Sequence, residues 1–98
     1  MTARFRREPW RVEWVDDVGE RMRALGAERY DRWRGRFSGA VSYAHRTLVV
    51  DAGLEGRELI GTLVHEAIHA EEPDLSEATV RRLERAVVSL VWPVVRRG

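Results

Sequence analysis

Apolar and polar residues alternate at the start of the chain. Trp10, Val12 and Trp14 share one side of the run from residue 10 to 15, which predicts a half-buried strand. Residues 48–50, Leu-Val-Val, are apolar on both faces, so the run 47–51 is expected inside a sheet, in a hairpin with residues 40–43. The strand at 40–43 has smaller and more polar residues and is expected at an edge. Residues 27–39 mix aromatics with glycines and are expected to be extended.

Apolar residues at three- and four-residue steps predict three helices. The first follows the capping pair Asp17 and Glu20 and stops at Gly26. The second begins near residues 55–57 and ends near residue 71, because Pro73 disfavours a helical residue before it. The third is expected over residues 75–92, with Asp74 as N-cap and a buried stripe formed by Val80, Leu83, Val87 and Leu90.

These elements predict a single α+β domain over residues 1–98, with a small twisted sheet of three to four strands packed on the second and third helices. The composition, 44% hydrophobic and 34% charged, is that of a globular domain. No apolar run reaches membrane-spanning length, and the N-terminus lacks the apolar core of a signal peptide. We therefore expect a cytoplasmic protein that does not interact with a membrane.

The charge is uneven along the chain. Residues 1–46 carry 11 arginines and 7 acids (+4), whereas residues 47–98 carry 6 arginines and 9 acids (−3). The N-terminal arginines alternate with acids and match no nucleic-acid-binding motif. This pattern favours a solvated surface, so nucleic acid is the less favoured partner.

The second predicted helix contains His65-Glu66-x-x-His69. Residues four apart lie on one face of a helix, so both imidazoles can reach one metal ion. Glu66 flanks that face and is the candidate general base that activates a zinc-bound water. The alternative interpretation is a pair of half-buried helix histidines beside a solvated glutamate.

A catalytic zinc site needs a third protein ligand, and the chain has no cysteine. No histidine follows His69, which leaves an acid or His45. If the chain turns back at Pro73, Glu77 lies level with the metal, whereas Glu84 lies ~10 Å further along the axis. An acid at position 77 also suits a helix start without any metal. His45 and Tyr43 are the candidate hydrogen-bond donors to a tetrahedral intermediate.

Several stretches together resemble the zincin metallopeptidases: residues 47–51, Leu54 and Leu59, residues 62–70 around the His-Glu motif, and residues 73–77. The resemblance spans about residues 45–92 and is greatest to small gluzincin-related metallopeptidases of bacterial and phage genomes. It implies a minimal zincin-like fold, a substrate along an edge strand, and zinc held by His65, His69 and a downstream glutamate. Without a large C-terminal subdomain, the cleft is expected to be open on one side.

Three hypotheses for the function follow. The leading one is a zinc (Zn²⁺) metallopeptidase that hydrolyses a peptide or protein substrate, with Glu66 as base and His65, His69 and Glu77 as ligands. The alternative is a non-catalytic zinc-stabilised regulatory or binding module with a protein or DNA partner. A third is a metal-free small α/β domain. The sequence specifies neither the substrate nor the oligomeric state.

Overall fold

The computed structural model describes the backbone of residues 1–25, 29–33 and 36–98, and the side chains of residues 1–25 and 38–98. Within these ranges the strands are β1 (Thr2–Phe5), β2 (Glu8–Val15), β3 (Arg29–Trp33), β4 (Arg36–Ser42) and β5 (Thr47–Asp51). The helices are α1 (Val18–Leu25), α2 (Gly56–Glu71) and α3 (Glu77–Val95). The extended conformation predicted for residues 27–39 is present in β3 and the first half of β4, while residues 26–28 and 34–35 lie outside the described backbone.

The sheet has the strand order β1-β2-β5-β4-β3. β2 and β5 run parallel, and the other neighbours are antiparallel. The predicted α+β class and the 40–51 hairpin are confirmed. The described sheet has five strands rather than three to four, because the short runs 2–5 and 29–33 add a strand at each edge.

The prediction that residues 40–43 form an edge strand is wrong. β4 lies between β5 and β3, and Ala40 is opposite Val49 on one side and Tyr30 on the other. Its small residues serve close helix approach instead: Ala40 packs with Val18 and Met22 of α1, and Gly39 lies against α2. The small residues of β4 are therefore explained by the helices that cover this strand and not by a position at the edge of the sheet.

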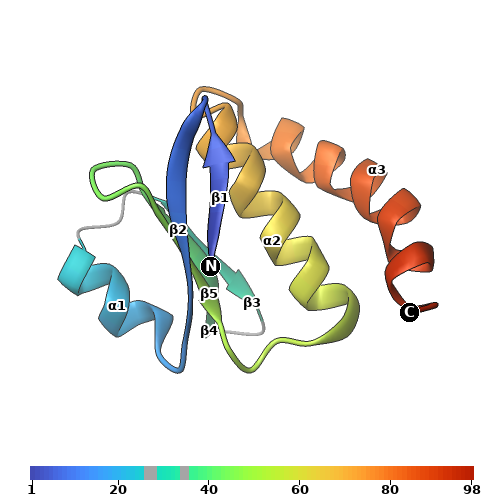
Figure 1. Cartoon of the computed structure of the whole chain (residues 1–98), viewed down its shortest axis with the longest axis horizontal. Coiled ribbons are helices and arrows are strands. Elements are labelled where there is room, and N and C mark those ends of the chain that lie inside the picture. The colour runs from blue at the N-terminus through green and yellow to red at the C-terminus, as the bar shows by residue number, and fades with distance from the viewer. Residues whose placement is uncertain (26–28, 34–35) are drawn as a thin grey trace.

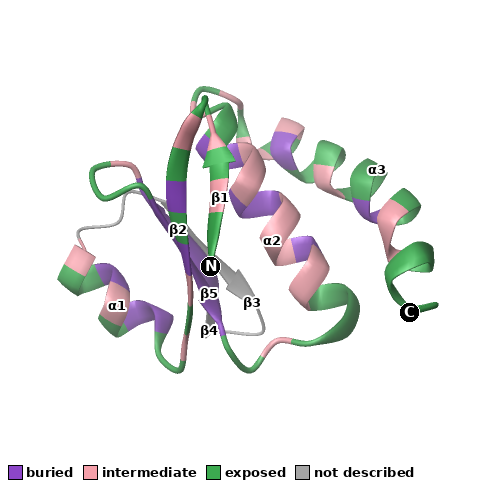
Figure 2. Ribbon diagram, viewed as in Figure 1, coloured by how far each residue is buried: buried purple, intermediate pink, exposed green. Residues whose placement is uncertain are grey.

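The helices lie in layers on both sides of the sheet (Figure 1). α1 packs on one face against Ala40 and Val49, while α2 covers the other face, where Leu48 and Val50 join the larger core cluster. Every residue of β5 is buried, as its doubly apolar pattern predicts (Figure 2). α3 packs on the outer side of α2, so two helices run side by side above the sheet.

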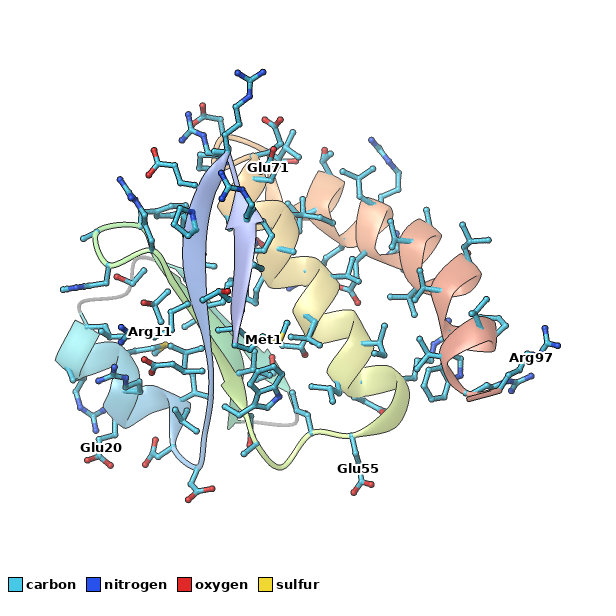
Figure 3. The ribbon with its side chains drawn as sticks, viewed as in Figure 1. Met1, Arg11, Glu20, Glu55, Glu71 and Arg97 are labelled. Atoms are coloured by element: carbon cyan, nitrogen blue, oxygen red, sulfur yellow. The ribbon has the colours of Figure 1, made fainter. Side chains whose placement is uncertain are left out.

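The helix boundaries largely follow the predicted signals. Asp17 Oδ1 accepts a hydrogen bond from the backbone N–H of Glu20 (3.0 Å), which confirms the cap of α1. α2 spans the predicted range, and Glu71 at its end accepts a hydrogen bond from the N–H of Arg6 in the β1–β2 turn (Figure 3). The N-cap of α3 is Ser76 rather than Asp74, because the Ser76 hydroxyl accepts the N–H of Thr79.

The buried face of α3 also differs from the prediction. Val80 is fully buried, but Leu83, Val87 and Leu90 are 37%, 40% and 75% exposed, and Val88 is buried instead. α3 contacts α2, and of the four residues in the predicted stripe only Val80 is buried, while the other three are exposed. Within the described chain, no helix is both long and apolar enough to cross a membrane.

Candidate metal centre

Helix α2 presents different residues to its two neighbours. Leu59, Leu63 and Ala70 pack against the sheet and form part of the larger core cluster. His65 and His69, one turn apart, contact glutamates of α3 instead. The i, i+4 spacing therefore places both imidazoles in the seam between the two helices, as the motif requires.

The third predicted ligand, Glu77, meets the two histidines in this seam. Its Oε1 lies 2.6 Å from His65 Nε2, and its Oε2 lies 3.0 Å from His69 Nε2. The two Nε2 atoms are 3.2 Å apart. The structure thus brings together all three residues predicted as ligands, and their ligand atoms lie within 4.8 Å of one another.

This donor set fits a zinc ion. Two imidazole nitrogens and a carboxylate are the ligands of a common catalytic zinc site, and atoms bonded to tetrahedral zinc lie ~3.3 Å apart. The observed separations of 2.6–3.2 Å are slightly shorter, because the groups here interact with one another directly. The histidines are nearly buried, with 8% and 1% of their side chains exposed, whereas Glu77 is 39% exposed.

Glu84 contacts the opposite side of the His65 ring. Its Oε1 lies 2.7 Å from His65 Nδ1. The count of helix rise predicts that Glu84 lies too far along α3 to be the third ligand, and Glu84 is outside the metal-ligand cluster, but its side chain still reaches the His65 ring. Helix side chains lean toward the N-terminus, and Gly61 on α2 leaves space for the carboxylate: a Cβ there would lie 3.0 Å from Glu84 Oε2. The sequence does contain a signal for this contact: Glu77 and Glu84 are seven residues apart, a spacing that places both side chains on the same face of a helix.

Glu66, the predicted base, faces the sheet and is fully buried. A Cβ added to Gly39 of β4 would lie 2.7 Å from Glu66 Oε2. Only glycine fits opposite this carboxylate without a shift of either element. The strand next to the predicted base is β4, which is not an edge, so the substrate arrangement implied by the zincin resemblance would differ here.

The two candidate hydrogen-bond donors lie elsewhere. His45 is exposed in the β4–β5 turn, where its backbone N–H donates to Ser42 Oγ, and it is outside the metal-ligand cluster. The Tyr43 hydroxyl donates to the backbone carbonyl of His69 (2.9 Å). Tyr43 therefore fixes the end of α2, and a role as donor to an intermediate stays a prediction.

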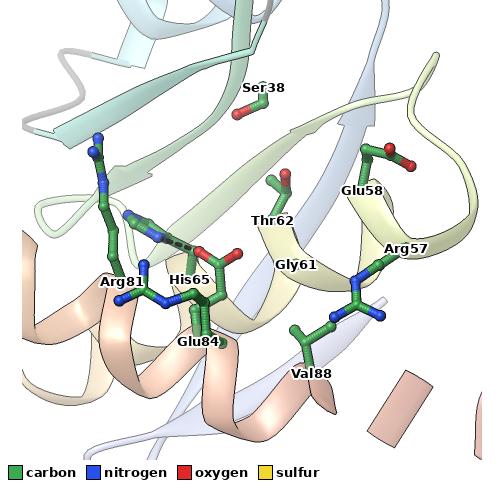
Figure 4. A pocket seen from close by; sticks show the side chains of 10 residues that line it. Ser38, Arg57, Glu58, Gly61, Thr62, His65, Arg81, Glu84 and Val88 are labelled. Carbon is green, nitrogen blue, oxygen red and sulfur yellow. Dashed lines mark hydrogen bonds and ion pairs between the residues drawn. The ribbon is translucent and has the colours of Figure 1, made fainter. Parts of the chain in front are cut away.

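A cavity of about 550 Å³ lies beside the centre, between α2, α3 and β4 (Figure 4). Its wall includes His65 and Glu84, and Ser38 lines it from the sheet side. Three arginines also line it, which the sequence pattern did not single out: Arg57, Arg81 and Arg85. A molecule that fills this cavity would contact His65, one of the candidate metal ligands.

Comparisons of the chain with protein-family models, with curated proteins and with solved structures give no match. The zincin resemblance therefore stays a prediction from the sequence stretches that carry it.

Proposed function

We propose that this chain is a zinc-dependent metallopeptidase. The observation that carries the proposal is the convergence of His65 Nε2, His69 Nε2 and the Glu77 carboxylate from two adjacent helices. Zinc, when bound there, supplies Lewis-acid polarisation of a carbonyl oxygen and lowers the pKa of water. Residues of the chain would transfer the protons and orient the ligands.

Glu66 has the role of proton carrier. As a carboxylate next to His65 in sequence, it takes a proton from the attacking water and returns it to the nitrogen of the leaving amine. Glu84 holds the His65 ring through Nδ1 and thereby leaves Nε2 directed at Glu77.

One observation favours a second function. Glu66 has no exposed surface and lies against Gly39, so a substrate water would reach it only after the strand and helix separate. A non-catalytic zinc-stabilised binding module needs no such access. In that module the same three ligands would join α2 to α3, and Glu66 would serve only packing.

Peptide cleavage by the zinc-loaded wild type and by Glu66→Gln separates the two functions. The peptidase proposal predicts that the wild type cleaves a mixed peptide library and that the variant is at least ~100-fold slower, with equal bound zinc. Glu55→Gln is the matched control, because Glu55 is exposed at the start of α2 and its side chain makes no capping bond.

Equal cleavage by wild type and Glu66→Gln would contradict the mechanism. Zinc binding with no cleavage by either protein would instead support the binding module. The cytoplasmic location expected from the sequence stays a prediction.

A further inference from the structure

Three arginines and two glutamates line the cavity between α2 and α3, so its lining has a formal charge of +1. Three of the six arginines in residues 47–98 line it, although that half of the chain has a net charge of −3. Arg57 comes from the first turn of α2, whereas Arg81 and Arg85 lie one turn apart on α3. Arginines from both helices therefore border one space.

The acidic residues of the cavity leave part of this charge available. Glu84 interacts with His65 Nδ1 at 2.7 Å, and Arg81 lies 3.8 Å from Glu77. Among the described residues, Arg57 and Arg85 form no ion pair, and both are exposed. Glu58 is the remaining acid, and Figure 4 shows it on the α2 side of the cavity, away from Arg81.

The shape and lining of the cavity suit a peptide side chain. Its volume of about 550 Å³ lies in the range of sites for small ligands. Val88 is buried in its wall and Thr62 supplies a methyl group and a hydroxyl, so the methylene groups of a bound side chain would have apolar contacts. Guanidinium groups bind carboxylates through paired, charge-assisted hydrogen bonds and repel cationic groups.

We infer that this cavity is an anion subsite that selects peptides with a carboxylate next to the bond to be cleaved. His65 belongs both to the candidate metal centre and to the cavity wall, so a peptide bound at the centre would have a neighbouring side chain near the cavity. This inference rests on the proposed peptidase function, but the preference for peptides with a carboxylate can be measured by binding alone, without cleavage. The carboxylate could come from an aspartate or glutamate side chain or from the C-terminus of the peptide.

The test measures peptide binding by the zinc-loaded Glu66→Gln protein, using fluorescence anisotropy. Three amidated octapeptide pools carry Glu, Gln or Lys at a central position among otherwise random uncharged residues. A fourth pool carries Gln and a free C-terminus. We expect the Glu pool to bind about 10-fold more tightly than the Gln pool, as one charge-assisted contact implies, and the Lys pool to bind most weakly. Tighter binding of the fourth pool alone would identify the C-terminal carboxylate as the source.

Substitutions in the same protein locate the subsite. Arg57→Gln and Arg85→Gln should each reduce the preference for carboxylate, and the double variant should abolish it. Arg82→Gln is the matched control, because Arg82 is exposed on α3 between Arg81 and Arg85 in sequence but does not line the cavity. It should leave the preference unchanged.

The outcomes separate this inference from the peptidase proposal. Equal binding of all four pools, or an equal loss in Arg82→Gln and Arg85→Gln, overturns the anion subsite even if the wild type cleaves peptides. An arginine-dependent preference in a protein whose wild type cleaves nothing supports the subsite and rejects the peptidase.

Discussion

His65 is held on both ring nitrogens by glutamates of the same helix. Glu77 contacts Nε2 and Glu84 contacts Nδ1, at 2.6 and 2.7 Å. If Nε2 held a metal, Nδ1 would carry the proton and its N–H would donate a hydrogen bond to the Glu84 carboxylate, which would fix the ring orientation. Glu77 and Glu84 are seven residues apart and therefore lie on one face of α3. From this face α3 supplies both a candidate ligand, Glu77, and the group that orients His65, Glu84.

Replacing Glu84 should therefore weaken metal binding without removing a ligand. We expect Glu84→Gln to lower zinc affinity by about 10-fold or more, the usual range for a partner of a metal-bound histidine. Competition with a chromophoric chelator measures the affinity. Glu72→Gln, at an exposed glutamate in the α2–α3 connection, serves as the control and should bind zinc as the wild type does. Unchanged affinity in Glu84→Gln would mean that the contact does not orient the ring.

A second residue-scale prediction concerns Glu13, remote from the centre. Hydrogen bonds from Arg21, at 2.7 and 2.9 Å, lower the pKa of the Glu13 carboxyl in the folded state. A carboxyl with a lowered folded-state pKa stabilises the fold above its unfolded-state pKa, and this contribution is lost as the pH falls through the folded value.

Urea unfolding at two pH values checks this linkage. Glu13→Gln should unfold at lower urea than the wild type at pH 7, and the difference should shrink toward zero below the ordinary value of 4.5 as Glu13 becomes protonated. An equal difference at pH 7 and pH 3 would show that the pair contributes through packing rather than charge.

At the scale of elements, the approach of α2 to α3 depends on Gly61. Alanine is favoured over glycine in a helix by about 1 kcal/mol, but a Cβ at position 61 would lie 3.0 Å from Glu84 Oε2. We expect Gly61→Ala to keep or raise the stability of the zinc-free protein while lowering zinc affinity, because Glu84 shifts away from His65. Thermal melts with chelator and zinc titrations measure the two effects separately. A loss of stability in the zinc-free protein together with a loss of zinc affinity would point to a general disruption of the helix pair.

The elements that the sequence predicts well are those with strong local signals. β5 is apolar on both faces, α1 has its capping pair, and Pro73 marks the end of α2, so the sequence alone places each of them. The same proline turn made it predictable that Glu77 lies beside His65 and His69. These signals depend on short stretches of chain.

The sequence-based predictions are wrong for features that tertiary packing determines. Periodicity identifies an apolar stripe on α3 but not which helix face α2 covers, so Leu90 was expected in the core although it is 75% exposed. The cavity could not be predicted for the same reason, since Arg57 and Arg85 meet only when α2 and α3 pack together.

At the scale of the whole molecule, a bound metal would link α2 to α3 through side chains of both helices. Val80 and Val88 are the buried hydrophobic residues of α3. Zinc at 100 times its Kd should add about 2.7 kcal/mol to the free energy of unfolding, and hence raise the melting temperature by roughly 10 °C or more. EDTA should reverse the shift, and His69→Ala should prevent it. Identical melting with zinc and with EDTA would contradict a metal that joins α2 to α3.

Zinc content after equilibrium dialysis, measured by mass spectrometry on the wild type and on Glu77→Ala, tests the central claim most directly. Circular dichroism should first show that both proteins retain their helices. We predict one zinc per wild-type chain and a clear loss in the variant, because His65 and His69 then lack the ligand supplied by α3. A wild type without zinc, or a variant that retains as much zinc as the wild type, would contradict a centre built from His65, His69 and Glu77.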